Sequence, residues 1–324
     1  MRPSRRELLA AALIGVPGLG RAADPPTFRL GVLPFGTVSW EAELIRARRF
    51  DDAEGFRLDT LRLAGNDAAR IAFLGGQVDA IVSDLLWAAR LRNDGRAVRF
   101  IPFSSTEGAL MVPARSPVTR LADLKGKRIG IAGGPLDKNW LLLRAAAERE
   151  GTDLVAAASL AFGAPPLLSE KLQSGELDAA LLYWSFSARL EAKGFRRLIS
   201  ADDVTRRFGI EGKVALLGYL VDEPRHAARA QLVSAMVRAS RRAKAALGAD
   251  EAAWQVVRPL MEAPDDATFQ MLRRYFLDGV PDRPVGAERA DAERLYAVLA
   301  ELGGEKFVGR GTTFPAGLYW EQAP

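Results

Sequence analysis

The apolar positions of this chain come in short runs that are separated by longer amphipathic stretches. Apolar runs over residues 28–33, 58–63 and 78–82 predict three β-strands, and Ser83 and Asp84 follow the third as helix-capping residues. The stretches between the runs have helical spacing and begin after polar residues. Strand, turn and helix therefore alternate, which predicts an α/β fold with mainly parallel sheets covered by helices.

One part of this pattern occurs twice, at an offset of 99 residues. The segments 76–95 and 175–194 share seven of 20 aligned positions, and the run 28–33 matches 127–132 at the same offset. Two landmarks in one register predict two similar lobes with a cleft between them. The alternative is that any two units of strand, turn and helix read alike, which would still give a repeating βα fold.

Two further apolar segments are placed to carry the chain between the lobes. They cover residues 108–112 and 214–221. We therefore expect lobe one to comprise 27–111 and 218–324, with lobe two, 112–217, inserted between these parts. Two crossings form a double hinge, a geometry that allows the lobes to open and close.

The first 22 residues have the order of an export signal. Three arginines precede an apolar run, and small residues then predict cleavage after Ala22. The stretch around Arg5 and Arg6 resembles a twin-arginine signal, with a general secretory signal as the alternative. Four arginines against one glutamate give this segment +3 of the total charge of +5, so the remaining +2 argues against nucleic-acid binding.

The chain contains no cysteine, so disulfides, thiol catalysis and cysteine metal sites are excluded. Export without disulfides fits the periplasm. No metal-ligand spacing, phosphate loop or catalytic triad is recognisable, and we expect neither a metal nor a cofactor.

Several motifs together resemble a known family. The run Leu121–Gly134, the Gly-x-hydrophobic-Asp-Ala strands at 76 and 175, and the export signal are similar to the substrate-binding proteins of bacterial ABC importers. Within these, the chain resembles the nitrate, sulfonate, taurine and thiamine-precursor class, which has the type II periplasmic-binding fold. The resemblance covers nearly all of residues 27–324 and says nothing about which ligand is bound.

The resemblance implies a ligand held between the lobes, at the carboxyl ends of the strands, where parallel sheets also bind ligands on physical grounds. The residues at these strand ends are the candidate contacts. In lobe one they are Thr37, Ser39, Trp40, Asn66, Ser83 and Asp84. In lobe two they are Gly133, Gly134, Asp137, Lys138, Asn139, Tyr183 and Trp184.

These candidates favour two different ligands. Asp84 facing Tyr183 and Trp184 suits an amine, a ring N–H or a cation over aromatic faces, unless Asp84 only caps a helix. Gly133, Gly134 and Lys138 suit an oxyanion, unless the two glycines only form a tight turn. We favour the planar or amine-bearing organic compound.

The resulting hypothesis is a monomeric, non-catalytic periplasmic receptor that delivers a small organic solute to an ABC permease. Ligand contacts with both lobes would favour the closed state. The alternative is an enzyme on the same fold, of the menaquinone-pathway or thiamine-pathway type. Export argues against the enzyme, and a chain without cysteine cannot supply the Cys-rich iron-binding motif of the thiamine-pathway synthase.

Overall fold

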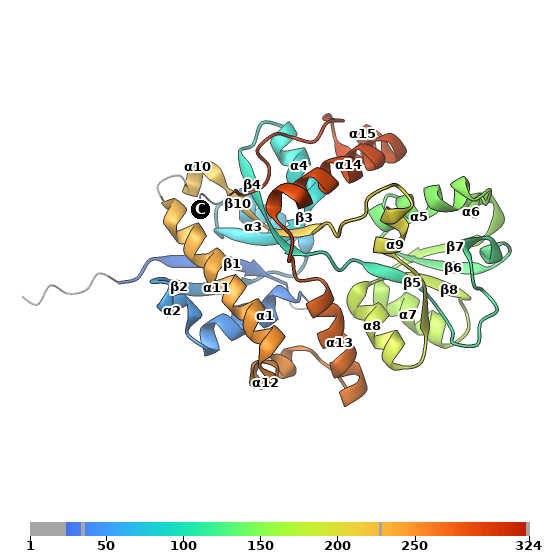
Figure 1. The fold of residues 1–324 in the computed structure, drawn as a ribbon, viewed down its shortest axis with the longest axis horizontal. Coiled ribbons are helices and arrows are strands. Elements are labelled where there is room, and N and C mark those ends of the chain that lie inside the picture. Colours follow the sequence, from blue (N-terminus) through green and yellow to red (C-terminus); the bar gives the residue numbers. More distant parts are fainter. Residues whose placement is uncertain (1–23, 34–35, 227–228, 322–324) are drawn as a thin grey trace, which may run out of the picture.

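Two five-stranded sheets lie side by side and form the body of the molecule (Figure 1). The computed structural model describes residues 24–33, 36–226 and 229–321, so the predicted export signal lies outside the described residues. The first sheet has the order β2-β1-β3-β10-β4, and its strands are β1 (Thr27–Val32), β2 (Arg57–Arg62), β3 (Ala80–Asp84), β4 (Val98–Ser104) and β10 (Leu217–Asp222). The second has the order β7-β6-β8-β5-β9, with strands β5 (Gly108–Val112), β6 (Arg128–Ala132), β7 (Ser159–Gly163), β8 (Ala179–Tyr183) and β9 (Arg196–Ser200).

The two sheets have the same construction. In each, one strand runs antiparallel to its neighbours, β10 between β3 and β4 and β5 between β8 and β9, and the remaining pairs are parallel. These two antiparallel strands coincide with the apolar segments expected to cross between the lobes, since β5 covers residues 108–112 and β10 lies largely within 214–221. The mainly parallel α/β fold with two similar halves is therefore confirmed.

Helices cover both faces of each sheet, as the alternating pattern predicts. Those connecting the strands of the first sheet are α1 (Val38–Ala47), α2 (Phe50–Ala53), α3 (Asn66–Leu74) and α4 (Leu85–Asn93). Those of the second half are α5 (Lys138–Arg149), α6 (Leu154–Ala157), α7 (Pro165–Gln173), α8 (Trp184–Ala192) and α9 (Ala201–Arg206), with a 3-10 turn at Leu121–Leu124.

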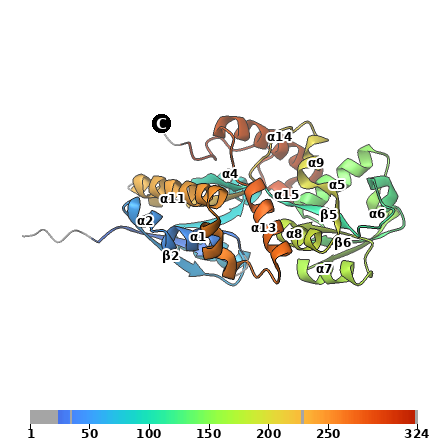
Figure 2. The same ribbon diagram turned by 60° about the horizontal axis from the view of Figure 1, so that its bottom comes forward.

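The C-terminal third of the chain is helical. It contains α10 (Glu223–His226), α11 (Ala230–Ala249), α12 (Glu251–Val257), α13 (Asp266–Asp278), α14 (Val285–Gly303) and α15 (Glu305–Val308), with a 3-10 turn at Arg258–Leu260. The long helix α11 buries Leu232, Val233, Met236 and Val237, the apolar face that its sequence spacing predicts. It packs along α1 on the first sheet, whereas α13 packs on α8 and α14 on α5 (Figures 1 and 2).

The repeat seen in the sequence is reproduced in the structure without a change of register. Strand β8 and helix α8 have the bounds of β3 and α4 shifted by 99 residues. The aspartates that both copies share, Asp79 and Asp178, make the same contacts. Asp79 accepts a hydrogen bond from the backbone N–H of Arg29 at 2.7 Å and pairs with its guanidinium at 3.1 Å, and Asp178 does the same to Arg128 at 2.8 and 3.0 Å.

This clamp explains the Gly-x-hydrophobic-Asp-Ala motif. The glycines, Gly76 and Gly175, have φ angles of 76° and 79°, in the left-handed region that favours glycine. They turn the chain out of the preceding helix, and the aspartate then fastens the incoming strand to its neighbour. One prediction of bounds was wrong here, because β3 covers residues 80–84 rather than 78–82. Residue 79 is engaged in the clamp, and pairing with β10 extends the strand to Asp84.

Candidate functional site

The carboxyl ends of the parallel strands carry the candidate site, as predicted for such sheets. Helices α1, α4, α5 and α8 all begin just after a strand at this edge. Two corresponding hydrogen bonds hold it together. The N–H of Leu85 at the start of α4 donates to the carbonyl of Leu216 at 2.9 Å, and the N–H of Trp184 at the start of α8 donates to the carbonyl of Glu107 at 3.0 Å.

Asp84 ends β3 and caps α4. Its Oδ1 accepts from the backbone N–H of Trp87 at 2.9 Å, and its Oδ2 lies 3.1 Å from the guanidinium of Arg70. The Arg70 guanidinium also lies over the Trp87 ring, 4.9 Å from its centroid. The Nε of Arg70 is buried, and the described part of the chain offers it no hydrogen-bond partner. The capping role of Asp84 is thus present, while its contact with a ligand stays a prediction.

A buried cluster lies on the second half, around the start of α5. The ammonium of Lys138 lies 2.7 Å from Oε2 of Glu107, and these side chains are 16% and 6% exposed. The amide of Asn139 donates to the same Oε2 at 3.4 Å. The other oxygen of Glu107 and the Oδ1 of Asn139 are buried and accept no hydrogen bond from the described residues. Two acceptors are therefore left unpaired at the site.

Glu107 was not among the residues singled out from the sequence. It lies on the short connection between β4 and β5, and only the folded crossing brings it to Lys138. The available signal was a charge immediately before a buried apolar strand, which is too common to identify a site.

The pKa values in this cluster share one direction. Burial raises the pKa of Glu107 above its usual range, although Lys138 opposes the shift. Burial also raises the pKa of Asp137. Burial lowers the pKa of Lys138, but Glu107, Asp137 and Asp84 outweigh this effect, so its net pKa is raised. All three raised pKa values mean that these groups hold their protons tightly, the two carboxyls because of burial and Lys138 because of the carboxylates around it.

The loop between β6 and α5 brings Gly133, Asp137 and Tyr183 together. Gly133 has a φ of 96°, and a Cβ atom there would lie 3.0 Å from Oδ2 of Asp137 and 3.1 Å from the hydroxyl of Tyr183. Asp137 caps α5 by accepting from the backbone N–H groups of Asn139 and Trp140, at 2.9 and 3.2 Å. Burial and the charge of Asp137 raise the pKa of Tyr183. An anion on this loop would meet the Asp137 carboxylate.

The aromatic candidates pack mainly against protein. Trp40 is buried, donates from its indole N–H to the carbonyl of Leu260 at 3.2 Å and lies edge-on to Trp184 at 6.0 Å. Trp184 is buried as well and stacks on Tyr275 at 6.4 Å. Tyr183 is 40% exposed. Of the three, Tyr183 is the ring that the structure leaves open to a ligand.

The remaining candidates are spread along the same edge. Thr37 precedes α1 without a side-chain capping bond, and the Ser39 hydroxyl donates to the carbonyl of Gly36 at 2.6 Å. Asn66 begins α3 and is exposed, Ser83 pairs with Gly218 across the sheet, and Gly134 is partly buried. The structure thus brings Gly133, Asp137, Lys138, Asn139 and Tyr183 into one cluster, with Asp84 within electrostatic range of it.

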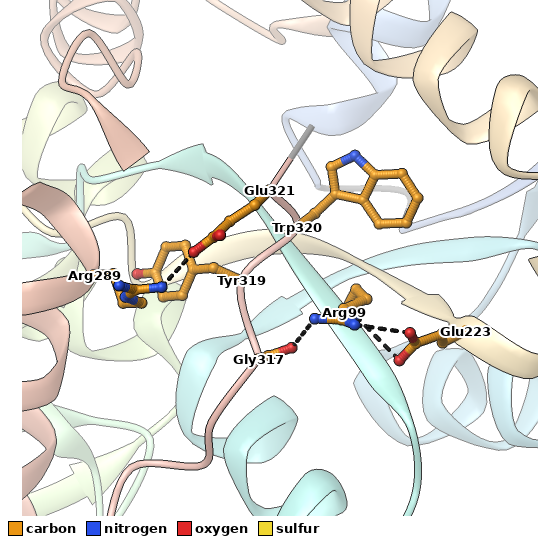
Figure 3. Close-up of a pocket in the computed structure, with 7 residues that line it drawn as sticks. All are labelled: Arg99, Glu223, Arg289, Gly317, Tyr319, Trp320 and Glu321. Carbon is orange, nitrogen blue, oxygen red and sulfur yellow. Dashed lines mark hydrogen bonds and ion pairs between the residues drawn. The ribbon is translucent and has the colours of Figure 1, made fainter. Parts of the chain in front are cut away.

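A separate hollow of about 360 Å³ lies at the opposite end of the first sheet, lined by residues of β4, α14 and the C-terminal segment (Figure 3). Its charges are paired internally, because Arg99 pairs with Glu223 at 2.7 Å and Arg289 pairs with Glu321. We therefore place the candidate site at the carboxyl edge instead.

Among the described residues no group of side chains has the composition to hold a metal ion. No helix within the described ranges is long and apolar enough to span a membrane.

Comparisons with known proteins agree with the resemblance found in the sequence. Residues 102–252 match the model of the NMT1/THI5-like family. No curated protein matches the chain in sequence.

Solved structures match over nearly the full length. The alkanesulfonate-binding protein SsuA of Xanthomonas axonopodis pv. citri, bound to MOPS, is 16% identical with a TM-score of 0.66, over 92% of this chain and 99% of its own. The periplasmic aliphatic sulphonate binding protein SsuA of Escherichia coli is 15% identical with a TM-score of 0.71, over 93% and 94%. The desulfurization enzyme DSZB is 18% identical with a TM-score of 0.58, over 90% and 97%.

At these identities the matches establish a common fold. The chain is thus similar to the NMT1/THI5-like family over residues 102–252, and it shares its fold over nearly its whole length with the two SsuA binding proteins and with DSZB.

Proposed function

We propose that this protein is the periplasmic substrate-binding component of an ABC importer and that it captures a small organic solute between two lobes. The observation that carries the proposal is the pair of sheets with the same strand order, joined by two crossings, in a fold shared with binding proteins over nearly the whole chain. The fold alone is also compatible with an enzyme, since DSZB has it. Conversion of a bound compound by the purified protein would favour that alternative.

The mechanism follows from the two crossings. We expect one lobe on each sheet, as proposed for residues 27–111 with 218–324 and for residues 112–217, except that β5 from Gly108 onward belongs to the second sheet. Rotation about the crossings then opens and closes the space between the lobes. A ligand that touches both lobes favours the closed state by the difference in its affinity for the two states. The permease in the inner membrane then recognises the closed form, and we expect the receptor to act as a monomer.

The charges of the site support an amine or ring N–H on the ligand in preference to an oxyanion. Glu107, Asp137 and Asp84 supply three carboxylates, and Lys138 and Arg70 supply two cations. Lys138 is already paired with Glu107, so it is not free to neutralise an incoming anion. The SsuA proteins bind sulfonates, whereas this set of side chains carries a net negative charge.

Native mass spectrometry of protein prepared from the periplasm tests the proposal. We expect a chain that begins at Ala23 and carries a small organic compound, which is lost when the protein is unfolded and refolded. Refolded protein is the matched control, because it has the same chain without the cell's ligand. Full-length protein confined to the cytoplasm, without a bound compound, would contradict the proposed function.

A further inference from the structure

Within the proposed function, on which this inference rests, we infer that the ligand is a protonated amine attached to an apolar body. Its ammonium group binds the free acceptors of Glu107 and Asn139, and its body lies against Tyr183 and Leu136. The fold does not determine which ligand is bound, so the inference rests on the side chains of the site.

The two unpaired acceptors require hydrogen-bond donors. A buried acceptor without a partner costs free energy comparable to its desolvation. Lys138 and Asn139 both contact Oε2 of Glu107, whereas Oε1 of Glu107 and Oδ1 of Asn139 are buried and have no donor among the described residues. An ammonium group has up to three donors and can satisfy both. A sulfonate or carboxylate has only acceptors and would place a second negative group beside the Glu107 carboxylate.

The position that corresponds to Glu107 in the other copy carries an apolar residue. Strand β5 pairs with β8 through Gly108 and Tyr183, and β10 pairs with β3 through Leu217 and Asp84. The residue before each of these strands, Glu107 or Leu216, accepts the same backbone hydrogen bond from the start of the next helix. Leu216 is a buried apolar residue. The backbone hydrogen bond at this position therefore does not depend on a carboxylate, and within this inference the Glu107 carboxylate serves the ligand.

An apolar surface adjoins these acceptors. Among the described residues, eight large apolar side chains are exposed, and four of them lie at the carboxyl edge of the second sheet: Leu136, Phe162, Leu167 and Tyr183. Single exposed apolar residues are ordinary, but a gathering at one edge indicates a binding surface. Tyr183 pairs with the residue after Glu107, and Leu136 directly precedes Asp137. The carboxylate and the apolar surface are therefore neighbours.

Three probes separate the parts of this inference: 2-phenylethylammonium, 2-phenylethanesulfonate with the same body, and ethylammonium with the head alone. We expect calorimetry on refolded protein to show binding of 2-phenylethylammonium, with at least tenfold weaker binding of the other two. Glu107→Gln removes the charge and should weaken phenylethylammonium binding about tenfold to a hundredfold. Asn139→Ser provides a second variant in case Glu107→Gln unfolds.

Matched controls test the position of each change. Glu150→Gln lies at the other end of α5, and Val155→Ala lies on α6 at the far edge of the sheet with the same 52% exposure as Leu136. Leu136→Ala should weaken phenylethylammonium at least threefold, while neither control should alter its affinity.

The outcomes separate the inference from the proposed function. Binding of 2-phenylethanesulfonate but not of the amine overturns the inference and leaves the receptor function standing. Absence of amine binding, or amine affinity unchanged by Glu107→Gln and Asn139→Ser in folded protein, also overturns it. The receptor function itself is tested separately, and it is contradicted if protein prepared from the periplasm carries no bound compound.

Discussion

The structure predicts that Glu288 on α14 makes the stability of the protein depend on pH near neutrality. Its Oε1 accepts from the backbone N–H of Ala215 at 3.3 Å and from the hydroxyl of Tyr319 at 3.5 Å. Burial raises its pKa from 4.5 to about 7, against the opposing hydrogen bond from Ala215 and the charge of Arg283. Asp282 adds to the rise, and Arg283 is already paired with Asp291 at 2.6 Å.

The sign follows from the raised pKa. Between the ordinary pKa and 7 the folded protein holds this proton more tightly than the unfolded chain, so stability falls as pH rises through that interval. Each pKa unit corresponds to about 1.4 kcal/mol, so ionisation of Glu288 costs up to about 3 kcal/mol between pH 4 and pH 8. Ala215 lies in the crossing that leads into β10, so ionisation of Glu288 destabilises the connection between the two halves.

Glu288→Gln removes the titration and keeps an oxygen acceptor for Ala215. Urea unfolding followed by tryptophan fluorescence should show similar stability of the two proteins at pH 5, and a variant that is more stable by up to about 3 kcal/mol at pH 8. Glu293→Gln, on the same helix with a half-exposed side chain, controls for the substitution. A stability difference between wild type and Glu288→Gln that stays constant from pH 5 to pH 8 would refute the reasoning.

Three further predictions follow from other charged groups. Lys244 and Glu41 form a buried ion pair beside Tyr219. Lys244→Met should therefore lower the free energy of unfolding in urea by about 3 to 5 kcal/mol, and adding Glu41→Gln should restore most of that stability. A double variant that regains no stability would contradict this. Asp79→Asn should lower the melting temperature more than Asp178→Asn, because the Asp79 side chain is 6% exposed and that of Asp178 is 33% exposed. Equal decreases in melting temperature would show that burial does not set the strength of this contact. Asp84→Asn keeps the helix cap and loses only a partly exposed ion pair with Arg70, so the melting temperature should change little while 2-phenylethylammonium binds about tenfold more weakly. Unchanged affinity would assign Asp84 to the cap and the Arg70 pair alone.

Much of the fold could be predicted from the sequence because the pattern was local. The apolar runs, the caps and the repeat at 99 residues each depend on short segments, and the bounds of β8 and α8 follow from those of β3 and α4. The position of α13 and α14 could not be predicted in this way. An amphipathic spacing shows which side of a helix is buried, but not that α13 packs on α8 or that α14 packs on α5.

The candidate site was predicted in part for the same reason. Tyr183 ends β8, and Asp137, Lys138 and Asn139 lie where the loop after β6 enters α5, so the topology of the sheet places them. Glu107 and Arg70 reach the site through tertiary packing, and their chemistry depends on partners distant in the sequence. The sequence left Lys138 as a candidate for binding an anion, because its ion pair with Glu107 is formed only in the folded chain.

The two copies of the repeat agree in the residues that hold the strands together and differ at the strand ends that form the candidate site. Residues that fasten strands are the same in both: Gly76 and Gly175 turn the chain, and Asp79 and Asp178 hold the neighbouring strand. The residues that end the strands differ, Asp84 in one copy and Tyr183 in the other. A symmetric pair of lobes thus presents a carboxylate on one side and an aromatic ring with a buried carboxylate on the other. A ligand with a positively charged head and an apolar body fits carboxylates and an aromatic ring at one site. A small anion has neither the charge nor the apolar surface for these side chains.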